Sequence, residues 1–227
     1  MNTSASTILS ANGLCKSYHM PSGRLDVLHD VSLDLKAGEQ LAITGASGSG
    51  KTTLLSLLAG LDAPDRGTIT LAGQRIESLG EDEWARMRGK WMGIVFQKFH
   101  LIPSLTALEN VALPLHILED QRAEEKAAAL LAQVGLGDRA HHLPRELSGG
   151  ESQRVAIARA LAPAPRLILA DEPSGNLDTK TGEYVMDMLF KLSSEHGAAL
   201  ALVTHDLTLA KRCGRQIVLQ QGRVVSA

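Results

Sequence analysis

A glycine-rich segment, Gly45-Ala46-Ser47-Gly48-Ser49-Gly50-Lys51-Thr52, carries the clearest chemistry in this chain. It fits the spacing G-x-x-x-x-G-K-[ST] and lies between a predicted strand and a predicted helix. Glycines let the backbone wrap tightly, so that successive N–H groups point at phosphate oxygens, and the start of the helix adds the positive end of its dipole. The ammonium group of Lys51 can reach the β- and γ-phosphates, and the Thr52 hydroxyl can ligate Mg²⁺. The segment therefore predicts a nucleotide phosphate site, but kinases, GTPases and motor ATPases share it.

Two acidic residues, Asp171 and Glu172, follow the apolar run Leu167–Ala170. Open α/β sheets bind ligands at the carboxyl ends of their strands, and adjacent strand residues point to opposite faces. The two carboxylates can therefore do different work. We expect Asp171 to hold Mg²⁺ through its water shell and Glu172 to polarise the attacking water. Alone, such a pair is more often a solvated strand end, and the upstream phosphate loop favours the catalytic interpretation.

A second phosphate-binding device is predicted at Leu147–Arg154, before the helical run Val155–Leu161. Ser148 is a good N-cap, and the following two glycines leave backbone N–H groups free to approach a phosphate closely. One chain needs only one γ-phosphate cradle. A second cradle makes sense if it serves the nucleotide of another subunit.

Short apolar runs alternate with helical stretches, which predicts an α/β fold with a mostly parallel sheet. The helix behind the phosphate loop, Thr52–Leu61, should pack its leucines inward. A closing hairpin is expected across Gln221-Gly222. The strands are predicted at Leu41–Thr44, Gly93–Phe96, Leu167–Ala170, Ala199–Val203, Ile217–Leu219 and Val224–Val225.

The middle of the chain lacks strand patterns and is predicted to be helical from Thr106 to Ala162. Asp120 is expected to N-cap a helix over Gln121–Val134, which Gly135 would end. This stretch is interpreted as a helical subdomain inserted into one domain spanning residues 1–227. The α/β core is predicted over about 1–97 and 163–227, and the helical subdomain over about 98–162.

The composition is ordinary, with 44% hydrophobic and 21% charged residues among 227. A net charge of −2 gives no case for a nucleic-acid partner, which would favour a basic excess. Two cysteines do not make a disulfide framework. No signal peptide or membrane-spanning apolar run is recognised, so we expect a cytoplasmic protein whose membrane role comes through a partner.

The segment Leu147–Arg154, Leu-Ser-Gly-Gly-Glu-Ser-Gln-Arg, resembles the signature motif of ABC ATPases, and the other family motifs follow in order over essentially the whole chain. The resemblance implies a P-loop NTPase (RecA-like) core with an N-terminal antiparallel β part. It also implies that Tyr18 stacks on adenine and that His205 hydrogen-bonds the γ-phosphate. Gln97 matches the glutamine that contacts Mg²⁺ and senses the transporter partner.

The resemblance further implies an ATP-driven homodimer in which each nucleotide lies between two subunits. Hydrolysis and phosphate release would then weaken the contact between the two subunits, the dimer seam. The residues expected to bind ATP are Tyr18, Gly45, Ala46, Ser47, Gly48, Ser49, Gly50, Lys51, Thr52 and Thr53. Those expected to contact the ATP of the other subunit are Leu147, Ser148, Gly149, Gly150 and Glu151, and those at the dimer seam are Ser174, Gly175, Asn176, Leu177 and Asp178. The expected catalytic residues are Glu172, His205, Lys51 and Gln97, and the expected Mg²⁺ ligands are Thr52, Gln97 and Asp171.

Three further segments resemble the ABC group that serves bacterial lipoprotein release and macrolide export: Ala59–Asp62, Phe96–Pro103 and the sequence around Asn176. Within that group the chain is most similar to an uncharacterised branch that accompanies a large predicted permease. The resemblance implies an integral membrane permease as partner, with this chain peripheral on the inner face of the cell membrane. The apolar stretch Phe99–Pro103 either docks that permease or packs within the helical subdomain.

Other classes fit the sequence less well. A DNA-repair or chromosome-organising ABC ATPase would carry a long coiled coil between Thr52 and Leu147, where no heptad array occurs. A translation-associated ABC protein would hold two cassettes, and a kinase or GTPase leaves Ser148–Arg154 unexplained. An ATP-dependent regulator of a cell-envelope or division complex, without transport, remains an alternative.

Overall fold

The computed structural model describes residues 6–21 and 23–226. The chain forms two compact units. Unit 1 comprises the chain up to Arg88 and from Ala198 onward, and unit 2 spans Gly89–Gly197. Unit 2 thus includes strands as well as helices. The helical subdomain predicted over about 98–162 is a smaller segment, and its boundaries stay a prediction.

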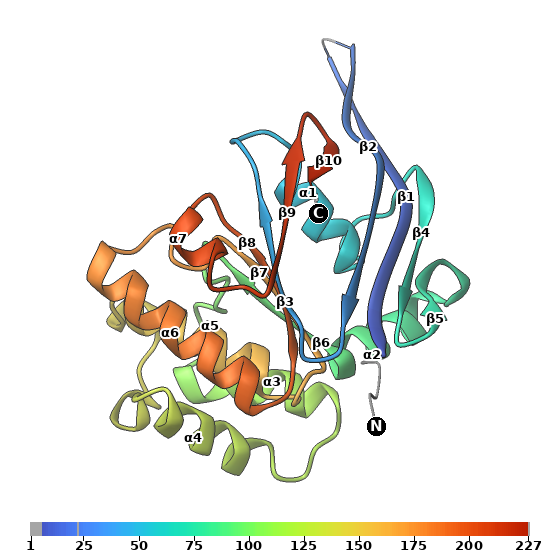
Figure 1. Ribbon diagram of the computed structural model, residues 1–227. Helices are drawn as coiled ribbons and strands as arrows, with labels where there is room; N and C mark the ends of the chain where they lie inside the picture. The colour runs from blue at the N-terminus through green and yellow to red at the C-terminus, as the bar shows by residue number, and fades with distance from the viewer. Residues whose placement is uncertain (1–5, 22, 227) are drawn as a thin grey trace, which may run out of the picture. The chain divides into compact units, whose positions relative to one another are not determined.

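Unit 1 contains an antiparallel sheet with strand order β2-β1-β4-β5 (Figure 1). The first two strands make a long ribbon in which apolar residues such as Leu9, Leu14 and Leu35 are fully buried. This sheet confirms the N-terminal antiparallel part that the family resemblance implied. Its strands are β1 (Thr7–Met20), β2 (Gly23–Lys36), β4 (Arg66–Leu71) and β5 (Gln74–Arg75).

A second set of strands in unit 1 has the order β10-β9-β3-β8. These are β3 (Gln40–Thr44), β8 (Ala199–Val203), β9 (Arg215–Gln220) and β10 (Arg223–Ser226). β3 pairs in parallel with both β8 and β9, and all five residues of β8 are buried, as expected of a strand covered on both faces. The closing hairpin turns through Gln221 at φ 45° and Gly222 at φ 73°, the two positive φ angles of a type I′ turn. The four strands predicted in this part of the chain are confirmed.

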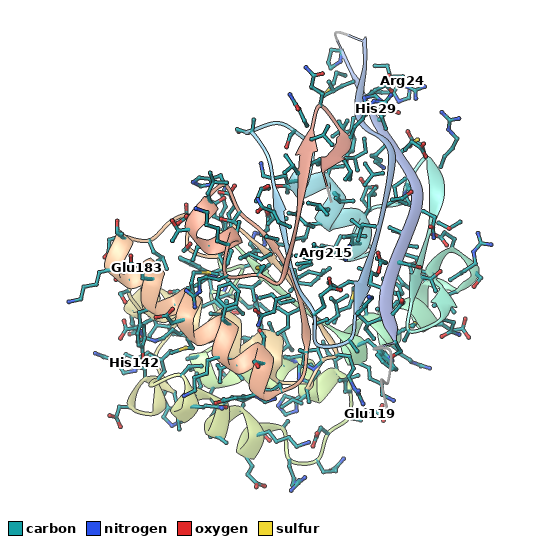
Figure 2. The ribbon with its side chains drawn as sticks, viewed as in Figure 1. Arg24, His29, Glu119, His142, Glu183 and Arg215 are labelled. Atoms are coloured by element: carbon teal, nitrogen blue, oxygen red, sulfur yellow. The ribbon has the colours of Figure 1, made fainter. Side chains whose placement is uncertain are left out.

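Helix α1 (Lys51–Leu58) packs against both β2 and β8. Its four leucines are buried, as predicted, and the helix ends before Gly60, which adopts φ 59°. A Cβ at Gly60 would lie 2.3 Å from the Trp84 ring, so only glycine fits there. Arg215, labelled in Figure 2, binds Glu39 at 2.7 Å and the Asp34 carbonyl, which holds the start of β9 to the end of β2. Unit 1 also contains η1 (Ile76–Ser78), most of α2 (Glu81–Trp91) and α7 (Leu207–Ala210).

In unit 2, a parallel strand pair carries a group of helices. The elements are β6 (Met92–Phe96), α3 (Ala107–Ile117), α4 (Ala123–Gln133), η2 (Gly137–Arg139), η3 (Pro144–Glu146), α5 (Gly149–Leu161), β7 (Leu167–Asp171) and α6 (Thr179–Glu195). Helix α5 is central, because it contacts α3, α4, α6 and β6. Gly93 permits the close approach of β6, since a Cβ there would lie 2.3 Å from the Ala160 carbonyl oxygen. The absence of strands between Thr106 and Ala162 confirms the helical middle.

The prediction that Asp120 caps the following helix is wrong. Helix α4 begins at Ala123, and its N-cap is Arg122, which makes no side-chain cap. The Asp120 carboxylate instead accepts a hydrogen bond from the Arg122 N–H at 2.9 Å and pairs with Lys126. Aspartate side chains can bond several nearby backbone N–H groups, and here Asp120 forms a local turn with Arg122 and does not cap the helix. Gly135, at φ 70°, ends this helical segment as predicted.

Within the described residues, no helix is both long and apolar enough to cross a membrane.

Candidate functional site

The glycine-rich loop joins β3 to α1 in unit 1 and is shaped by three glycines with positive φ. Gly45, Gly48 and Gly50 adopt φ values of 148°, 77° and 101°. A Cβ at Gly45 would lie 2.1 Å from the Leu219 carbonyl oxygen, and one at Gly50 would lie 2.8 Å from Leu28. The loop can therefore follow this path only with glycine at these positions.

Lys51 lies at the start of α1 and is 7% exposed. Its ammonium group donates to the carbonyl oxygens of Gly45 and Ala46, at 2.9 Å each. The Ser49 hydroxyl is buried in the same loop without a hydrogen-bond partner. A buried hydroxyl of this kind costs free energy unless a ligand supplies its partner. The loop thus combines a buried cation with an unsatisfied polar atom, as a phosphate cradle requires.

His205 leaves the same edge of the sheet as the glycine-rich loop. β3 and β8 run parallel, with Ile43 opposite Val203, so Gly45 and His205 follow equivalent strand ends. The Thr204 N–H donates to the Ile43 carbonyl at 3.2 Å, and Asp206 caps α7 by accepting from Thr208 at 2.6 Å. Anchors on both sides therefore fix the backbone of the exposed histidine.

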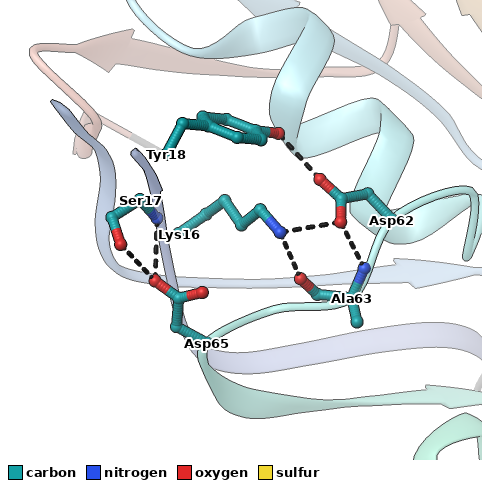
Figure 3. A network of polar contacts seen from close by, with 6 residues as sticks. All are labelled: Lys16, Ser17, Tyr18, Asp62, Ala63 and Asp65. Atoms are coloured by element: carbon teal, nitrogen blue, oxygen red, sulfur yellow. Dashed lines mark hydrogen bonds and ion pairs between the residues drawn. The ribbon is translucent and has the colours of Figure 1, made fainter. Parts of the chain in front are cut away.

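Tyr18 lies on β1 and is 36% exposed. Its hydroxyl donates to the Asp62 carboxylate at 2.8 Å, and the Lys16 ammonium lies 5.0 Å from the centre of its ring (Figure 3). Burial, followed by the hydrogen bond to Asp62, raises the pKa of Tyr18. Neither Lys16 nor Asp62 was assigned a role from sequence, although Asp62 lies in a segment that resembles the family.

In unit 2, Gln97 and the acidic pair come from neighbouring parallel strands. Phe96 of β6 lies opposite Asp171 of β7, so Gln97 and Glu172 leave the same edge. Glu172 adopts φ 43°, a left-handed conformation that costs a non-glycine residue free energy and is enriched at functional sites. Its carbonyl oxygen accepts from the Gly175 N–H at 2.9 Å, which closes the turn that presents the carboxylate.

A reciprocal pair of hydrogen bonds joins Gln97 to Asn176. The Gln97 Nε2 donates to the Asn176 Oδ1 at 3.2 Å, and the Asn176 Nδ2 donates to the Gln97 carbonyl at 2.9 Å. Gly175 allows this pairing, because a Cβ there would lie 2.7 Å from the Gln97 Nε2. Gln97 and the 174–178 loop, which the sequence predicts as separate motifs, are thus joined by hydrogen bonds.

Ser148 N-caps α5, as predicted, and the helix begins at Gly149, earlier than the run from Val155. The Ser148 hydroxyl accepts from the Glu151 N–H at 3.2 Å, and the Glu151 carboxylate accepts from the Ser148 N–H at 2.8 Å. This capping box lowers the pKa of Glu151, chiefly through the backbone hydrogen bond from Ser148. Ser148 and Gly149 are exposed, so this helix N-terminus is open to a ligand.

Gly150 is buried against α6. A Cβ at Gly150 would lie 2.4 Å from the Thr181 Cγ2, whereas one at Gly149 would lie 3.3 Å from Leu177. Helix packing alone therefore explains one of the two glycines that the sequence interpretation assigned to phosphate approach. Asp178 N-caps α6 by accepting from the Thr181 N–H at 3.1 Å, which gives the end of the 174–178 loop a structural role as well.

Arg159, a residue that sequence reasoning missed, fixes the segment after Gln97. Its guanidinium donates to the carbonyl oxygens of Phe99 at 2.8 Å and His100 at 2.6 Å. Phe99 and His100 both adopt left-handed backbone conformations, with φ 59° and 50°. Burial of the guanidinium lowers the pKa of Arg159. Because Arg159 lies on α5, this helix and the segment after Gln97 are held together.

Comparison with known proteins gives the same assignment. Residues 28–175 match the family described as ABC transporter. The chain is 49% identical, over 222 residues and 97% of each sequence, to the "Uncharacterized ABC transporter ATP-binding protein YbbA" of Escherichia coli K12, and the YbbA of Shigella flexneri shows the same identity and coverage.

Two solved structures of MJ0796 each align with a TM-score of 0.88, covering 96% of this chain and 97% of that one. One, at 42% identity, is the dimeric structure of a bacterial ABC transporter cassette, and the other, at 41%, is a dimeric post-hydrolysis state bound to ADP and Pi. The phosphate loop, the acidic pair and these matches lead to one conclusion. The chain belongs to the ABC transporter family, as an ATP-binding subunit that hydrolyses ATP.

Proposed function

We propose that this ATPase dimerises on ATP and drives an integral membrane permease from the cytoplasmic face of the membrane. The proposed work is cell-envelope export, lipoprotein release or mechanotransmission, in which the permease moves its periplasmic part without carrying a solute through a pore. The observation that carries the dimer is the exposed N-terminus of α5 at Ser148 and Gly149, in a chain whose own phosphate loop is complete. The dimeric MJ0796 cassettes support it. The family match supports the permease.

Unit 1 supplies the groups that bind the nucleotide in this proposal. Tyr18 stacks on adenine, and the backbone of Gly45–Thr53 wraps the phosphates. The buried ammonium of Lys51 neutralises charge on the β- and γ-phosphates, and the Ser49 hydroxyl gains the partner that it lacks. His205 hydrogen-bonds the γ-phosphate.

Unit 2 supplies the groups for hydrolysis. The proposed Mg²⁺ ligands are the Thr52 hydroxyl of unit 1, the Asp171 carboxylate and the Gln97 amide oxygen, which are the oxygen donors that Mg²⁺ prefers. The nitrogen of the Gln97 amide faces Asn176, so its oxygen is the atom able to ligate a cation. Bound Mg²⁺ would neutralise phosphate charge, and Glu172 accepts the proton of the attacking water.

The dimer completes each site in this proposal. The signature segment Leu147–Glu151 of one subunit covers the nucleotide of the other, and Ser174–Asp178 lies at the seam. Enclosure excludes water and adds the backbone N–H groups of α5 to the charge-stabilising shell. Phosphate release then loosens the seam, and the permease follows this cycle.

Replacing Glu172 with glutamine tests the catalytic assignment. We expect ATP turnover to fall about 100-fold or more, the contribution of a positioned general base, while an ATP-bound dimer accumulates. Turnover is measured by phosphate release, and dimerisation by light scattering with and without ATP. Glu119→Gln, the same change at an exposed position labelled in Figure 2, is the matched control. Normal turnover in Glu172→Gln would show that the assigned role is wrong.

Purification of the tagged chain from native membranes tests the partner. We expect an integral membrane protein to co-purify and, after reconstitution, to change the ATPase rate. Recovery of a cell-wall hydrolase or division protein, with no membrane permease, would instead support the regulator without transport. If no integral membrane protein were recovered, the permease proposal would fail.

A further inference from the structure

One carboxylate, Asp62, holds two side chains of β1. Its Oδ2 accepts from the Tyr18 hydroxyl at 2.8 Å, and its Oδ1 accepts from the Lys16 ammonium at 2.7 Å. The ammonium also donates to the Ala63 carbonyl at 2.7 Å, and the Ala63 N–H returns a hydrogen bond to Asp62 at 2.7 Å. Figure 3 shows both side chains of β1 directed at this carboxylate. The tyrosine hydroxyl is therefore fixed at one point.

Lys16 supports the ring itself. Its side chain is 10% exposed, and its ammonium lies 5.0 Å from the centroid of the Tyr18 ring, within cation–π range. Figure 3 shows the lysine stem running along one side of the ring. Since Tyr18 still has 36% of its surface exposed, the ring offers accessible aromatic area to a base.

The network also joins the tyrosine to the phosphate loop. The Thr53 side chain partly offsets the rise in the pKa of the Tyr18 hydroxyl and so lies beside it, and Thr53 belongs to the first turn of α1. Asp62 follows the end of the same helix. Tyr18 is thus bonded to Asp62 just after α1 and lies beside Thr53 in the first turn of that helix, close to Lys51 in the sequence.

The charge states fit this arrangement. Burial alone would raise the pKa of Asp62, but hydrogen bonds from Lys16 and Tyr18 outweigh it and hold that pKa below its usual value. Asp62 therefore stays ionised at neutral pH and accepts both hydrogen bonds. A charge-assisted hydrogen bond holds a side chain more firmly than a neutral one.

We propose that Asp62 and Lys16 are positioning residues that hold Tyr18 as a preformed platform for the nucleotide base. They contribute to affinity for the base and leave affinity for the phosphates unchanged. The inference rests on the proposed placement of adenine on Tyr18 and adds residues to it.

The test compares ATP with inorganic tripolyphosphate, which lacks the base. In Asp62→Ala, we expect the Kd for ATP to rise about two- to twelvefold, because a freed aromatic side chain must be immobilised on binding. The Kd for tripolyphosphate should stay the same. Both are measured by titration calorimetry. Asp26→Ala removes a carboxylate from the exposed Arg24–Asp26 pair and is the matched control, with neither Kd changed.

Tyr18→Phe provides a second, milder variant. It keeps the ring and its contact with Lys16 but removes the hydroxyl contacts, so we expect the Kd for ATP to rise, by no more than in Asp62→Ala. Adding Asp62→Ala to Tyr18→Phe should then produce little further change, because both substitutions release the same ring. Full additivity would show that Asp62 acts elsewhere.

The outcomes are distinguishable. Equal weakening of ATP and tripolyphosphate by Asp62→Ala would indicate a general structural role and overturn the inference, and so would unchanged ATP binding in both variants. If the unsubstituted protein bound ATP no more tightly than tripolyphosphate, the adenine contact of the proposed function would fail as well.

Discussion

Substitution of Gly150 by alanine separates helix packing from phosphate contact in the signature segment. A Cβ at this position would lie 2.4 Å from the Thr181 Cγ2, whereas carbon atoms normally pack at about 3.5–4.0 Å. Thr181 has little freedom to retreat, because it is β-branched and its N–H is bonded to Asp178 at 3.1 Å. The overlap must therefore be relieved by a change of the Thr181 χ1 rotamer or by moving α5 or α6.

The expected magnitude follows from two opposed effects. Overpacking of this kind costs about 1–3 kcal/mol, and alanine gains up to about 1 kcal/mol over glycine in a helix. With the full alanine gain, we expect the free energy of unfolding to fall by up to about 2 kcal/mol in Gly150→Ala. Gly149→Ala is the matched control. The nearest atom to its Cβ is the flexible end of Leu177 at 3.3 Å, so its unfolding free energy should stay the same or rise by up to about 1 kcal/mol.

Thr181→Ser supplies the rescue, because it removes the overlapping methyl group and leaves the Thr181 Cβ as the next atom, at 3.9 Å. The double variant should regain the stability lost in Gly150→Ala. Urea denaturation monitored by tryptophan fluorescence measures each midpoint. Equal midpoints for Gly150→Ala and Gly149→Ala, or no rescue by Thr181→Ser, would refute the packing argument. ATP-dependent dimerisation of the rescued variant then measures any separate requirement for glycine at the phosphate.

Three further predictions concern stability and thiol chemistry. Asn110 is fully buried, and its side chain bonds the Ile102 N–H at 2.8 Å and three carbonyl oxygens. Asn110→Ala should therefore lower the unfolding free energy, measured in urea, by about 2–3 kcal/mol. A loss no larger than that caused by replacing an exposed asparagine with alanine would contradict this. The pKa of Glu151 is lowered in the folded state, so its stabilisation is present above the ordinary glutamate value of 4.5 and is lost as pH falls through the folded pKa. The difference in unfolding midpoint between the native chain and Glu151→Ala should therefore shrink on acidification, and a constant difference would argue against the capping carboxylate. Burial raises the pKa of Cys213 to about 11. In a Cys15→Ser variant, the remaining thiol should therefore react slowly with Ellman's reagent in the folded chain at neutral pH and rapidly after the chain is unfolded in urea. Fast labelling of the folded chain would contradict this.

The strands and the phosphate loop were predictable because their signals are local. A strand buried on both faces must be apolar throughout, as Ala199–Val203 is, and this pattern placed β8 with its correct bounds. The loop was predictable because three positive φ angles require glycine at fixed spacing. The Ser148 cap was found for the same reason, since a cap depends on neighbouring residues.

The contacts that organise the site were not predictable, because they join residues far apart in the chain. Lys16 meets Asp62 across 46 positions, and Arg159 meets His100 across 59. No periodicity or spacing records such pairs. The error at Asp120 has a different source, since one side chain had two acceptable local partners and sequence alone did not rank them.

The ammonium of Lys51 is bonded to the carbonyl oxygens of Gly45 and Ala46. The lysine side chain therefore loses most of its rotamer freedom when the domain folds, a loss of up to about 2 kcal/mol of conformational entropy. Under the proposed function, ATP binding does not have to repeat this loss. Two of the three ammonium donors are engaged, and a phosphate oxygen needs only one. In the proposed function, ATP therefore meets a lysine that folding has already held in place.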